Sequence, residues 1–555
     1  MSRNLSEEKR ERMLNSLKTI KAEHSADEDV LIALNEIENE LTNKKYGLVW
    51  EEHEEEVDVQ MRENVPVFTE VKDREIIGDP DSENYNFLLE GDNLHSLKLL
   101  EKTHKGKVDV IYIDPPYNTG SRDFVYDDSY VDSVDSYRHS KWLSFMAERL
   151  NIARSLLSKK GCIFISIDAN EFAQLKILCD SLFGENNFIG CLIWRKKTGG
   201  GQTDEFFVTE HEYIMGYRKS SDFKWIDYSQ DANPNDYKFE DENGKYKIVK
   251  LEKWGSSAHR EDRPTMYSSI INPDGKETYP IAPDGKDGRW RVGLDRLDNL
   301  IKNNGVHWQK DKSGRWIPYE KLYFEEAKGK LLKSRSILYD IAETGTATKL
   351  LTSIFGRKDV FENPKPIEII KFILKHTKGN IILDFFAGSG STAQAVIESN
   401  IEEDRNSTFI LCTNNENKIC EEVTYQRIKT VITGIRKDGS TYSNGIPSNL
   451  KYYKTDFVSK NEENISDELL KHIKEMIQLE YMIDVDDKNY KIILLDEEAD
   501  DLEQNIDKYS EIKALFISRD VLLTAEQIKL FKNIQQYIIP DYYFNFELKE
   551  AGQLW

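Results

Sequence analysis

The residues best suited to chemistry follow a short apolar run in the string VDVIYIDPPYNTG, residues 108–120. The run predicts a buried strand, and Pro115 and Pro116 predict a rigid, extended turn directly after it. Ligands of open α/β sheets bind at the carboxyl ends of strands, where this turn offers the Asp114 carboxylate and the Pro115 carbonyl as acceptors. Two such acceptors push an aromatic amine toward tetrahedral geometry, and Tyr117 can stack on its ring. The string therefore predicts a site that makes an amine nucleophilic, with an inert turn as the alternative.

A second motif, IILDFFAGSGSTAQAV at residues 381–396, predicts a strand, a glycine-rich turn and the start of a helix. Gly388 and Gly390 permit a tight turn and a close approach of the backbone to a ligand. The turn is neither a GxGxxG fingerprint nor a phosphate-binding loop, which would carry a lysine. The next predicted strand ends before Glu416, whose carboxylate can hold ribose hydroxyls. The motif indicates a nucleoside-containing ligand, although Glu416 alone is also compatible with a surface acid in a loop.

The elements around the two motifs alternate between strands and helices. Strands are predicted at 86–89, 108–113 and 162–167, with helices at 93–103 and 136–158 between them. Buried strands that alternate with helices are typical of a parallel sheet with crossover helices. We therefore expect an α/β fold with a doubly wound, Rossmann-like sheet.

The chain outside this core changes character at both ends and in the middle. Two amphipathic helices are predicted over residues 5–45. Residues 195–337 are rich in turn signals such as NPDG and APDG, which predicts a β-rich insertion. The predicted division is an N-terminal helical segment (1–75), a first half of the core (76–194), the insertion (195–337), a second half of the core (338–450) and a C-terminal α/β extension (451–555).

The charge and the cysteines limit the class of protein. The net charge is −23, but residues 191–360 carry 30 Lys and Arg against 27 Asp and Glu. A near-neutral centre between acidic ends can hold a basic groove for nucleic acid. The five cysteines form no CxxC pair, so neither a disulfide framework nor a metal site is predicted. No apolar run is long enough to span a membrane and no signal peptide is recognisable, so we expect a cytoplasmic protein.

The two motifs together resemble those of the DNA amino-methyltransferases. DPPY resembles their catalytic motif and FAGSG resembles their S-adenosylmethionine motif, which here follows about 270 residues later. That permuted order, with a long insertion between the motifs, resembles the β group. GDNL (91–94), GCIFISID (161–168) and ENPKP (362–366) match further elements of this group. More narrowly, the string DPPYNTG resembles the modification subunits of type III restriction–modification systems, as do the segments KKYGLVWEEHEE (44–55), RPTMY (263–267) and GTATKLL (345–351).

The resemblance implies a set of site residues. The catalytic site would be formed by Asp114, Pro115, Pro116 and Tyr117. The pocket for S-adenosylmethionine would be lined by Asp92, Lys365, Asp384, Phe386, Ala387, Gly388, Gly390, Thr392 and Glu416. The methyl acceptor would be an adenine that has been extruded from duplex DNA. The first Asp of DPPY favours the adenine N6 amine, with the cytosine N4 amine as the alternative, and the chain has no Pro-Cys dipeptide for methylation at cytosine carbon 5.

The insertion is the expected region for recognising DNA. Its first residues, WRKKTGGGQ, provide candidate DNA contacts in Arg195, Lys196, Lys197 and Gln202. Four tryptophans are expected to pack the insertion rather than to contact DNA: Trp254, Trp290, Trp308 and Trp316.

The resemblance also implies partners, namely a second copy of the chain in a homodimer and an ATP-dependent restriction subunit. The sequence has no GxxxxGK[ST] loop, so the chain itself is not expected to hydrolyse ATP. Two other functions stay open at this point. One is methylation of RNA or of a protein side chain, and the other is a catalytically silent subunit that positions a nuclease on DNA.

Overall fold

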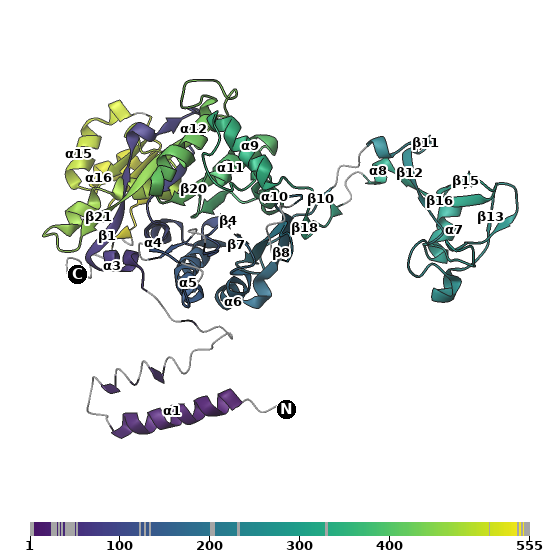
Figure 1. Ribbon diagram of the computed structural model, residues 1–555. Helices are drawn as coiled ribbons and strands as arrows, with labels where there is room; N and C mark the ends of the chain where they lie inside the picture. The colour runs from purple at the N-terminus through teal and green to yellow at the C-terminus, as the bar shows by residue number, and fades with distance from the viewer. Residues whose placement is uncertain are drawn as a thin grey trace. The chain divides into compact units, whose positions relative to one another are not determined.

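The computed structural model of the chain describes residues 5–23, 30–31, 34, 37–38, 50, 54–120, 124–126, 129–131, 135–199, 206–229, 234–327, 331–509, 511–540, 543–544 and 548. The chain divides into two compact units (Figure 1). One unit comprises residues 1–224 and 336–555, and the other comprises residues 225–335.

The first unit is built on a large mixed sheet. Its neighbouring strands are, in order, β1 (Asn64–Glu70), β21 (Asn449–Ser459), β3 (Asn86–Glu90), β20 (Thr408–Thr413), β19 (Ile381–Asp384), β4 (Val108–Ile113), β7 (Leu157–Ile167), β9 (His211–Arg218), β8 (Phe188–Arg195) and β18 (Ile337–Leu338). The strands from β21 to β7 run parallel, whereas β1 and β9 are antiparallel to their neighbours. Every residue of β3 and β20 is buried. Continuous apolar strands of this kind require cover on both faces.

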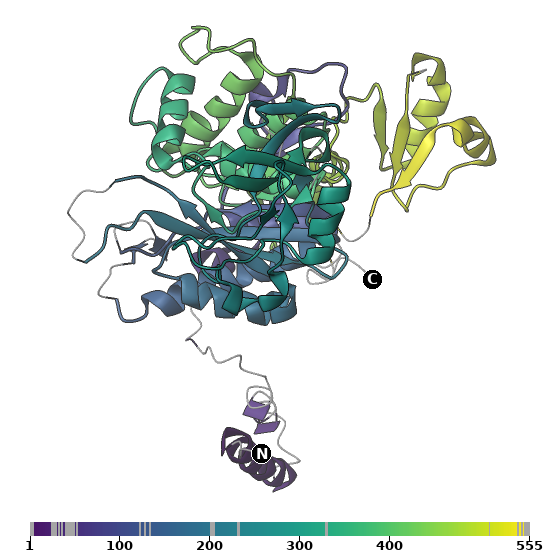
Figure 2. The same ribbon diagram turned by 90° about the vertical axis from the view of Figure 1, so that its right-hand side faces the viewer.

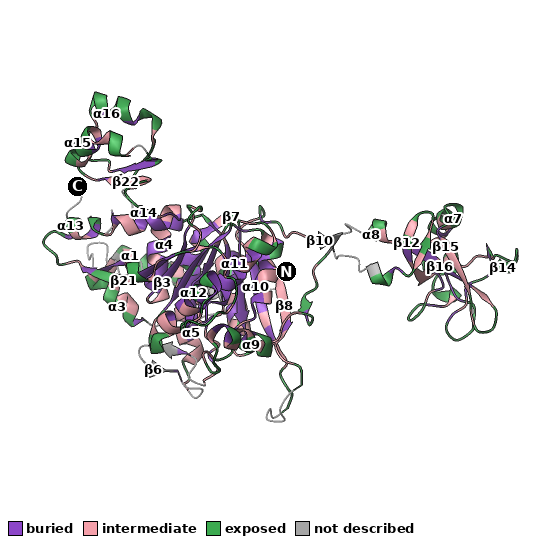
Figure 3. Cartoon of the chain, turned by 90° about the horizontal axis from the view of Figure 1, so that it is seen from above, coloured by how far each residue is buried: buried purple, intermediate pink, exposed green. Residues whose placement is uncertain are grey.

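Helices cover the two faces of the sheet (Figure 1). One face carries α4 (Asn93–His104), α5 (Arg138–Leu156) and α6 (Phe172–Phe183), which pack against one another in that order. The opposite face carries α10 (Ile367–Thr377), α11 (Ser391–Glu402) and α12 (Tyr425–Thr433), with α9 (Thr344–Phe355) against α12. Figure 3 shows buried residues concentrated where the strands and these helices meet. The predicted doubly wound α/β fold is confirmed.

The two sequence motifs become neighbours in the middle of this sheet. Strand β4 ends at the DPPY turn, and β19 ends at the glycine-rich turn. The two strands pair directly, with Val110 opposite Ile382 and Ile111 opposite Leu383. From β4 the sheet continues through β7, and from β19 it continues through β20 in the other direction. The strand order therefore reverses between β4 and β19, which is where ligands bind in doubly wound sheets.

Residues 225–335 form the second unit with its own small core. An antiparallel sheet consists of β11 (Phe239–Asp241), β12 (Gly244–Lys250), β16 (Trp316–Tyr323) and β15 (Val306–Lys310), next to α7 (Leu294–Lys302). Trp290 is fully buried in the core and Trp308 packs against it, as expected for the insertion. Trp254 is instead 59% exposed, and the indole N–H of Trp316 donates to Asp274 at the surface.

The observed units differ from the predicted division at three places. Strand β9 belongs to the main sheet, so the separate unit begins at Trp225 and not at residue 195. Strand β1 lies inside the predicted N-terminal helical segment, and most of β21 lies inside the predicted C-terminal extension, yet both belong to the same sheet. Such strands obtain their place from pairing with strands that are distant in sequence, which local sequence patterns do not reveal.

The ends of the chain add helices and a small sheet. At the N-terminus α1 (Leu5–Glu23) and α3 (Glu56–Glu63) are described, while most of the second predicted N-terminal helix lies outside the described residues. At the C-terminus β22 (Tyr490–Ile493), β23 (Ala514–Ile517) and β24 (Gln535–Ile538) form a parallel sheet, drawn in yellow in Figure 2. The helices of this region are α13 (Ile465–Leu470), α14 (Ile473–Tyr481), α15 (Asp496–Gln504) and α16 (Ala525–Leu530).

None of the described helices combines the length and the apolarity that a membrane span requires. The described part of the chain also contains no cluster of three or more His, Cys, Asp or Glu side chains that could hold a metal ion.

Candidate active site

The DPPY turn is anchored from the residues around it. The buried Trp142 of α5 donates its indole N–H to the carbonyl of Pro116 at 2.7 Å. After the motif, Asn118 has a left-handed backbone (φ 56°) and its side chain donates to Glu171 at 2.5 Å. The hydroxyl of Tyr117 lies 2.9 Å from Oδ1 of Asp114. The turn is therefore a rigid platform on which the Asp114 carboxylate has a defined orientation.

A buried cluster of charges contacts this platform. The ammonium of Lys365 lies 2.6 Å from the Tyr117 hydroxyl, 3.3 Å from Oδ1 of Asp114 and 2.7 Å from Oε2 of Glu212. Glu212 is the second residue of β9, and its other oxygen accepts from Lys196 at 3.0 Å. The side chain of Lys365 thus contacts two of the predicted catalytic residues, and its predicted place in the cofactor pocket stays a prediction.

The charges in the cluster balance one another. Burial raises the pKa of Asp114 above its ordinary value, an effect that Lys365 opposes and Glu212 reinforces. Burial alone would lower the pKa of Lys365, but Asp114 and Glu212 together raise it. Burial alone would raise the pKa of Glu212, but Lys365 and Lys196 lower it. Lys365 therefore carries its positive charge, and that charge favours the ionised forms of both Asp114 and Glu212.

The glycine-rich turn after β19 is held by hydrogen bonds to its own backbone and side chains. Asp384 accepts from the backbone N–H of Phe386 at 3.0 Å and from the hydroxyl of Thr392 at 2.5 Å. Burial raises the pKa of Asp384 to about 7. Gly388 and Gly390 both have positive φ, at 48° and 78°, which L side chains rarely adopt. Asp384 and Thr392 thus shape the turn from inside, and the two glycines make the turn possible.

Arg427 and the segment before α10 complete the anchoring of this turn. The fully buried guanidinium of Arg427 donates to the Ser389 carbonyl at 3.2 Å and to the Ser391 hydroxyl at 2.9 Å. The Ser391 hydroxyl donates to the carbonyl of Lys365 at 2.8 Å. Ala387 donates its N–H to the carbonyl of Cys412 in β20 at 3.1 Å. ENPKP is therefore joined to the residue directly after FAGSG, although neither sequence pattern predicts the contact.

A cavity of about 570 Å³ joins the DPPY turn and the glycine-rich turn. Its lining includes Asp114 and Pro115 from the first turn and Phe386 and Gly388 from the second. Two more of the nine predicted cofactor positions, Asp92 and Glu416, also line it. Residues from four separate stretches of sequence thus meet around one space at the reversal point of the sheet.

One wall of this cavity is aromatic and depends on a buried arginine that the sequence analysis missed. The ring of Phe145 packs against Phe386 with 5.8 Å between the ring centres. The guanidinium of Arg149 lies 3.7 Å from the centre of the Phe145 ring and makes a two-pronged ion pair with Glu55 at 2.6 and 2.9 Å. Arg149 also lies 3.4 Å from Asp92. Arg149 could have been found from the sequence, because it is a charged residue on the otherwise apolar face of α5. Glu212 could have been found in the same way, as an acid within the largely apolar strand β9.

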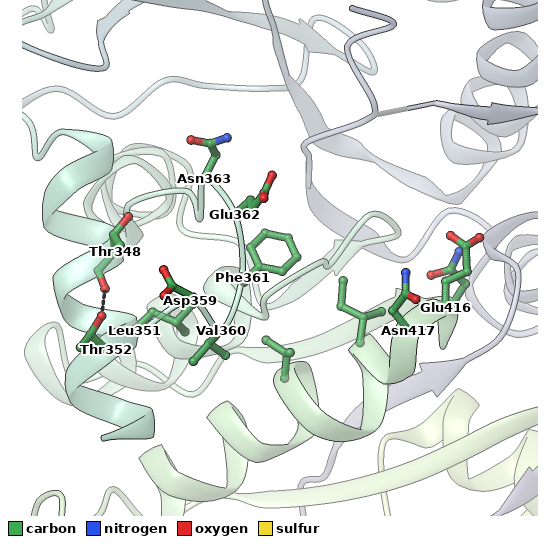
Figure 4. A pocket seen from close by; sticks show the side chains of 13 residues that line it. Thr348, Leu351, Thr352, Asp359, Val360, Phe361, Glu362, Asn363, Glu416 and Asn417 are labelled. Carbon is green, nitrogen blue, oxygen red and sulfur yellow. Dashed lines mark hydrogen bonds between the residues drawn. The ribbon is translucent and has the colours of Figure 1, made fainter. Parts of the chain in front are cut away.

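A second cavity of about 800 Å³ adjoins the first (Figure 4). Glu416 lines both cavities, as do Asn414 and Ile419. Figure 4 shows Phe361, Glu362 and Asn363 on the segment that faces Glu416 and Asn417 across this space. The first residues of ENPKP therefore line the second cavity, while Lys365 of the same string points to the catalytic motif.

Comparison with known proteins identifies the family. The model of the DNA methylase family matches residues 108–427, which is more than half of the chain. This chain belongs to the DNA methylase family. The methylase is 33% identical to the type II methyltransferase M.KpnI of Klebsiella pneumoniae, over 66% of this chain and 90% of that protein.

Two relatives of the methylase come from type III systems. It is 32% identical to the StyLTI Mod subunit of Salmonella typhimurium, over 69% of this chain and 62% of that subunit. It is 33% identical to the EcoPI Mod subunit of Escherichia phage P1, over 69% of this chain and 67% of that subunit. The predicted resemblance to type III modification subunits is confirmed, and the methylase matches about two thirds of their length. Among solved structures, the cytosine-N4-specific PvuII DNA methyltransferase aligns with a TM-score of only 0.31 at 11% identity, over 60% of this chain and 83% of that one.

The predicted DNA contacts of the methylase begin at the end of β8. Arg195 lies 3.4 Å from Glu343 in an ion pair, and Lys196 is paired with Glu212 as described above. Lys197 is half-buried, and Gln202 lies outside the described residues. Their role in binding DNA stays a prediction, and Lys196 is tied to the catalytic cluster in this structure.

Proposed function

We propose that this methylase transfers a methyl group from S-adenosylmethionine to the N6 amine of adenine in duplex DNA. The observation that carries the proposal is the shared cavity, in which Asp114 and Pro115 stand beside Phe386, Gly388 and Glu416. A base held by the first pair of residues and a cofactor held by the second set would meet in one space.

The residues of the cavity fit S-adenosylmethionine. Glu416 offers a carboxylate for the ribose hydroxyls, and Phe145 and Phe386 offer aromatic walls for the adenine ring. Gly388 leaves open a space beside Phe361 that a side chain would occupy. A Cβ atom at this position would lie only 3.3 Å from the Phe361 ring. When bound, S-adenosylmethionine supplies an electrophilic methyl group on its positively charged sulfur.

The catalytic residues act on the target amine. The Asp114 carboxylate and the Pro115 carbonyl accept its two hydrogens, which localises the nitrogen lone pair. As the nitrogen forms its new bond it becomes positively charged, and the neighbouring Asp114 carboxylate stabilises that charge in a site with little water. The surplus N–H proton leaves through the Asp114 oxygen that holds it. Lys365 keeps Asp114 ionised, and Glu212 holds Lys365 against the Tyr117 hydroxyl.

The pH dependence of activity tests this division of roles. Activity should fall as the pH drops through the pKa of Asp114, which burial raises above 3.8, because only the carboxylate accepts the amine hydrogens. In Lys365→Met the cation that opposes burial is lost, so the acidic limb of kcat/KM should move to higher pH by about one to three pH units. In Glu212→Gln a negative charge that raises the Asp114 pKa is lost, so the limb should move to lower pH.

The other ionisable groups near Asp114 are the same in both variants. They are Tyr112, Tyr117 and Asp384, together with Lys196, which pairs with Glu212. Glu210→Gln is a matched control, since Glu210 lies on the same segment and its carboxylate accepts, among the bonds described, only from the backbone N–H of Gly199. Its acidic limb should coincide with that of the wild type. Shifts in the same direction for Lys365→Met and Glu212→Gln would contradict the assignment.

The substrate class and the base can be tested together. Purified protein should transfer label from S-adenosylmethionine to duplex DNA and not to RNA or protein offered in parallel. Long-read sequencing of DNA from cells that express the chain should then report N6-methyladenine at one sequence motif. Modified cytosine at that motif would support the N4 alternative, and label in RNA or protein alone would refute the proposed substrate.

We further propose that the chain is the modification subunit of a type III system. The support is its sequence identity of 32% to the StyLTI Mod subunit and 33% to the EcoPI Mod subunit. The sequence also has no GxxxxGK[ST] loop for binding ATP. In that role two copies would share the work on DNA, and a separate ATP-driven restriction subunit would join them.

Light scattering tests the proposed dimer. We expect a mass of about twice 64.6 kDa, because one catalytic site and one insertion per chain allow one copy to read DNA while the other methylates. Methylation should need no ATP. A fully active monomer would contradict the dimer, and ATP hydrolysis by the purified chain would contradict the division between subunits.

A further inference from the structure

Two neighbouring aromatic side chains stand exposed where the chain returns toward the catalytic cluster. Phe206 is 80% exposed and Phe207 is 84% exposed, which makes them the most exposed large apolar side chains among the described residues. Val208 beside them is 39% exposed. Exposed apolar groups of this size are informative, because water disfavours them unless a partner covers them.

The position of these rings links them to the active site. The strands β8 and β9 pair antiparallel, and their pairing continues to Lys196, whose backbone N–H donates to the carbonyl of Glu210 at 2.8 Å. Glu212, at the base of this ribbon, contacts Lys365 and the Tyr117 hydroxyl. Phe206 lies six positions before Glu212, so the two can be at most about 20 Å apart. In Figure 3 the described chain beyond β8 is largely green, the colour of exposed residues.

The chemistry of the proposed reaction gives such a group a role. An adenine amine inside a duplex is paired and stacked, so the base has to leave the helix before it can reach Asp114. Extrusion leaves a gap in the base stack, and apolar side chains that insert between bases can compensate for lost stacking. Lys197 lies at the foot of the same ribbon and would supply positive charge to the phosphate backbone, as would Arg195 if DNA replaced Glu343 as its partner.

We propose that Phe206 and Phe207 form an apolar wedge that enters duplex DNA beside the target adenine and fills the gap its extrusion leaves. The proposal rests on the proposed function, because it presupposes that the substrate is a duplex. The wedge lowers the free energy of the extruded state, and it touches neither the cofactor nor the reacting atoms.

The test compares two duplexes that differ only opposite the target adenine. In the first the adenine faces thymine, and in the second it faces an abasic site, so that it is already unpaired. For the double variant Phe206→Ala, Phe207→Ala we expect kcat/KM to fall at least about tenfold on the first duplex and to recover to within about threefold of the wild type on the second. Affinity for S-adenosylmethionine should be unchanged. Leu522→Ala removes a side chain that is 78% exposed in the C-terminal extension and should behave like the wild type on both duplexes.

The outcomes separate the wedge from its alternatives. An equal loss on both duplexes, or no loss on either, would overturn the wedge. A loss accompanied by a smaller mass in light scattering would also overturn it and would assign the two rings to a protein interface. The wild-type arm tests the proposed function independently, since a wild type that methylates neither duplex would refute that function whatever the variant does.

Discussion

Asp114→Ala should abolish methylation, lowering kcat by roughly 10²–10³-fold or more, while the affinity for S-adenosylmethionine changes little. Asp114 follows β4, and its carboxylate faces Tyr117 and Lys365 in the wall of the cavity that the target base would enter. The glycine-rich turn, by contrast, is built from β19 and α11 and is anchored by Arg427. Loss of the carboxylate therefore removes the group that holds the amine and leaves the cofactor residues in place.

The measurement combines a methylation assay with calorimetric titration of S-adenosylmethionine. Asp438→Ala is a control, because Asp438 lies in an exposed turn, accepts from Ser440 and does not line the cavity. The control should keep near-normal turnover. Near-normal turnover in Asp114→Ala as well would remove Asp114 from the catalytic site, and a parallel loss of cofactor affinity would point to a general collapse of the pocket.

Gly388→Val should abolish binding of S-adenosylmethionine. Gly388 lines the cavity, has a φ of 48° and lies where a Cβ atom would approach the Phe361 ring to 3.3 Å. A β-branched side chain would fill this space and would also strain the backbone by about 1–2 kcal/mol. We expect no detectable heat of binding in calorimetry at concentrations that saturate the wild type.

Backbone strain alone can be separated from loss of the pocket. Gly439 also has positive φ, at 86°, and a Cβ atom there would meet nothing within 4 Å. Gly439→Val should therefore lose a similar amount of stability but retain the affinity of the wild type for the cofactor. If Gly388→Val bound S-adenosylmethionine as the wild type does, the cofactor would have to lie elsewhere, with the adjoining cavity of Figure 4 as the next candidate.

Local sequence was sufficient to predict the core elements and both motifs. The apolar run before Asp114 and the two prolines after it determine a strand and a rigid turn, since these preferences act over a few residues. The same holds for the strand before Asp384, and for Gly388 and Gly390, where only glycine adopts the required backbone readily. The alternation of such strands with helices was enough to predict the doubly wound sheet.

The tertiary structure decided which distant residues meet. Pairing of β4 with β19 brings Asp114 to the glycine-rich turn across about 270 residues of sequence. It also turns Lys365 toward Tyr117 and places Glu212 beside it, in a strand that the sequence analysis had assigned to the insertion. These contacts are long-range, and their energies depend on burial and on partners that no local window contains. For that reason the sequence by itself determined the turns and the residue types of the site, whereas the charge cluster around Asp114 emerged only from the folded chain.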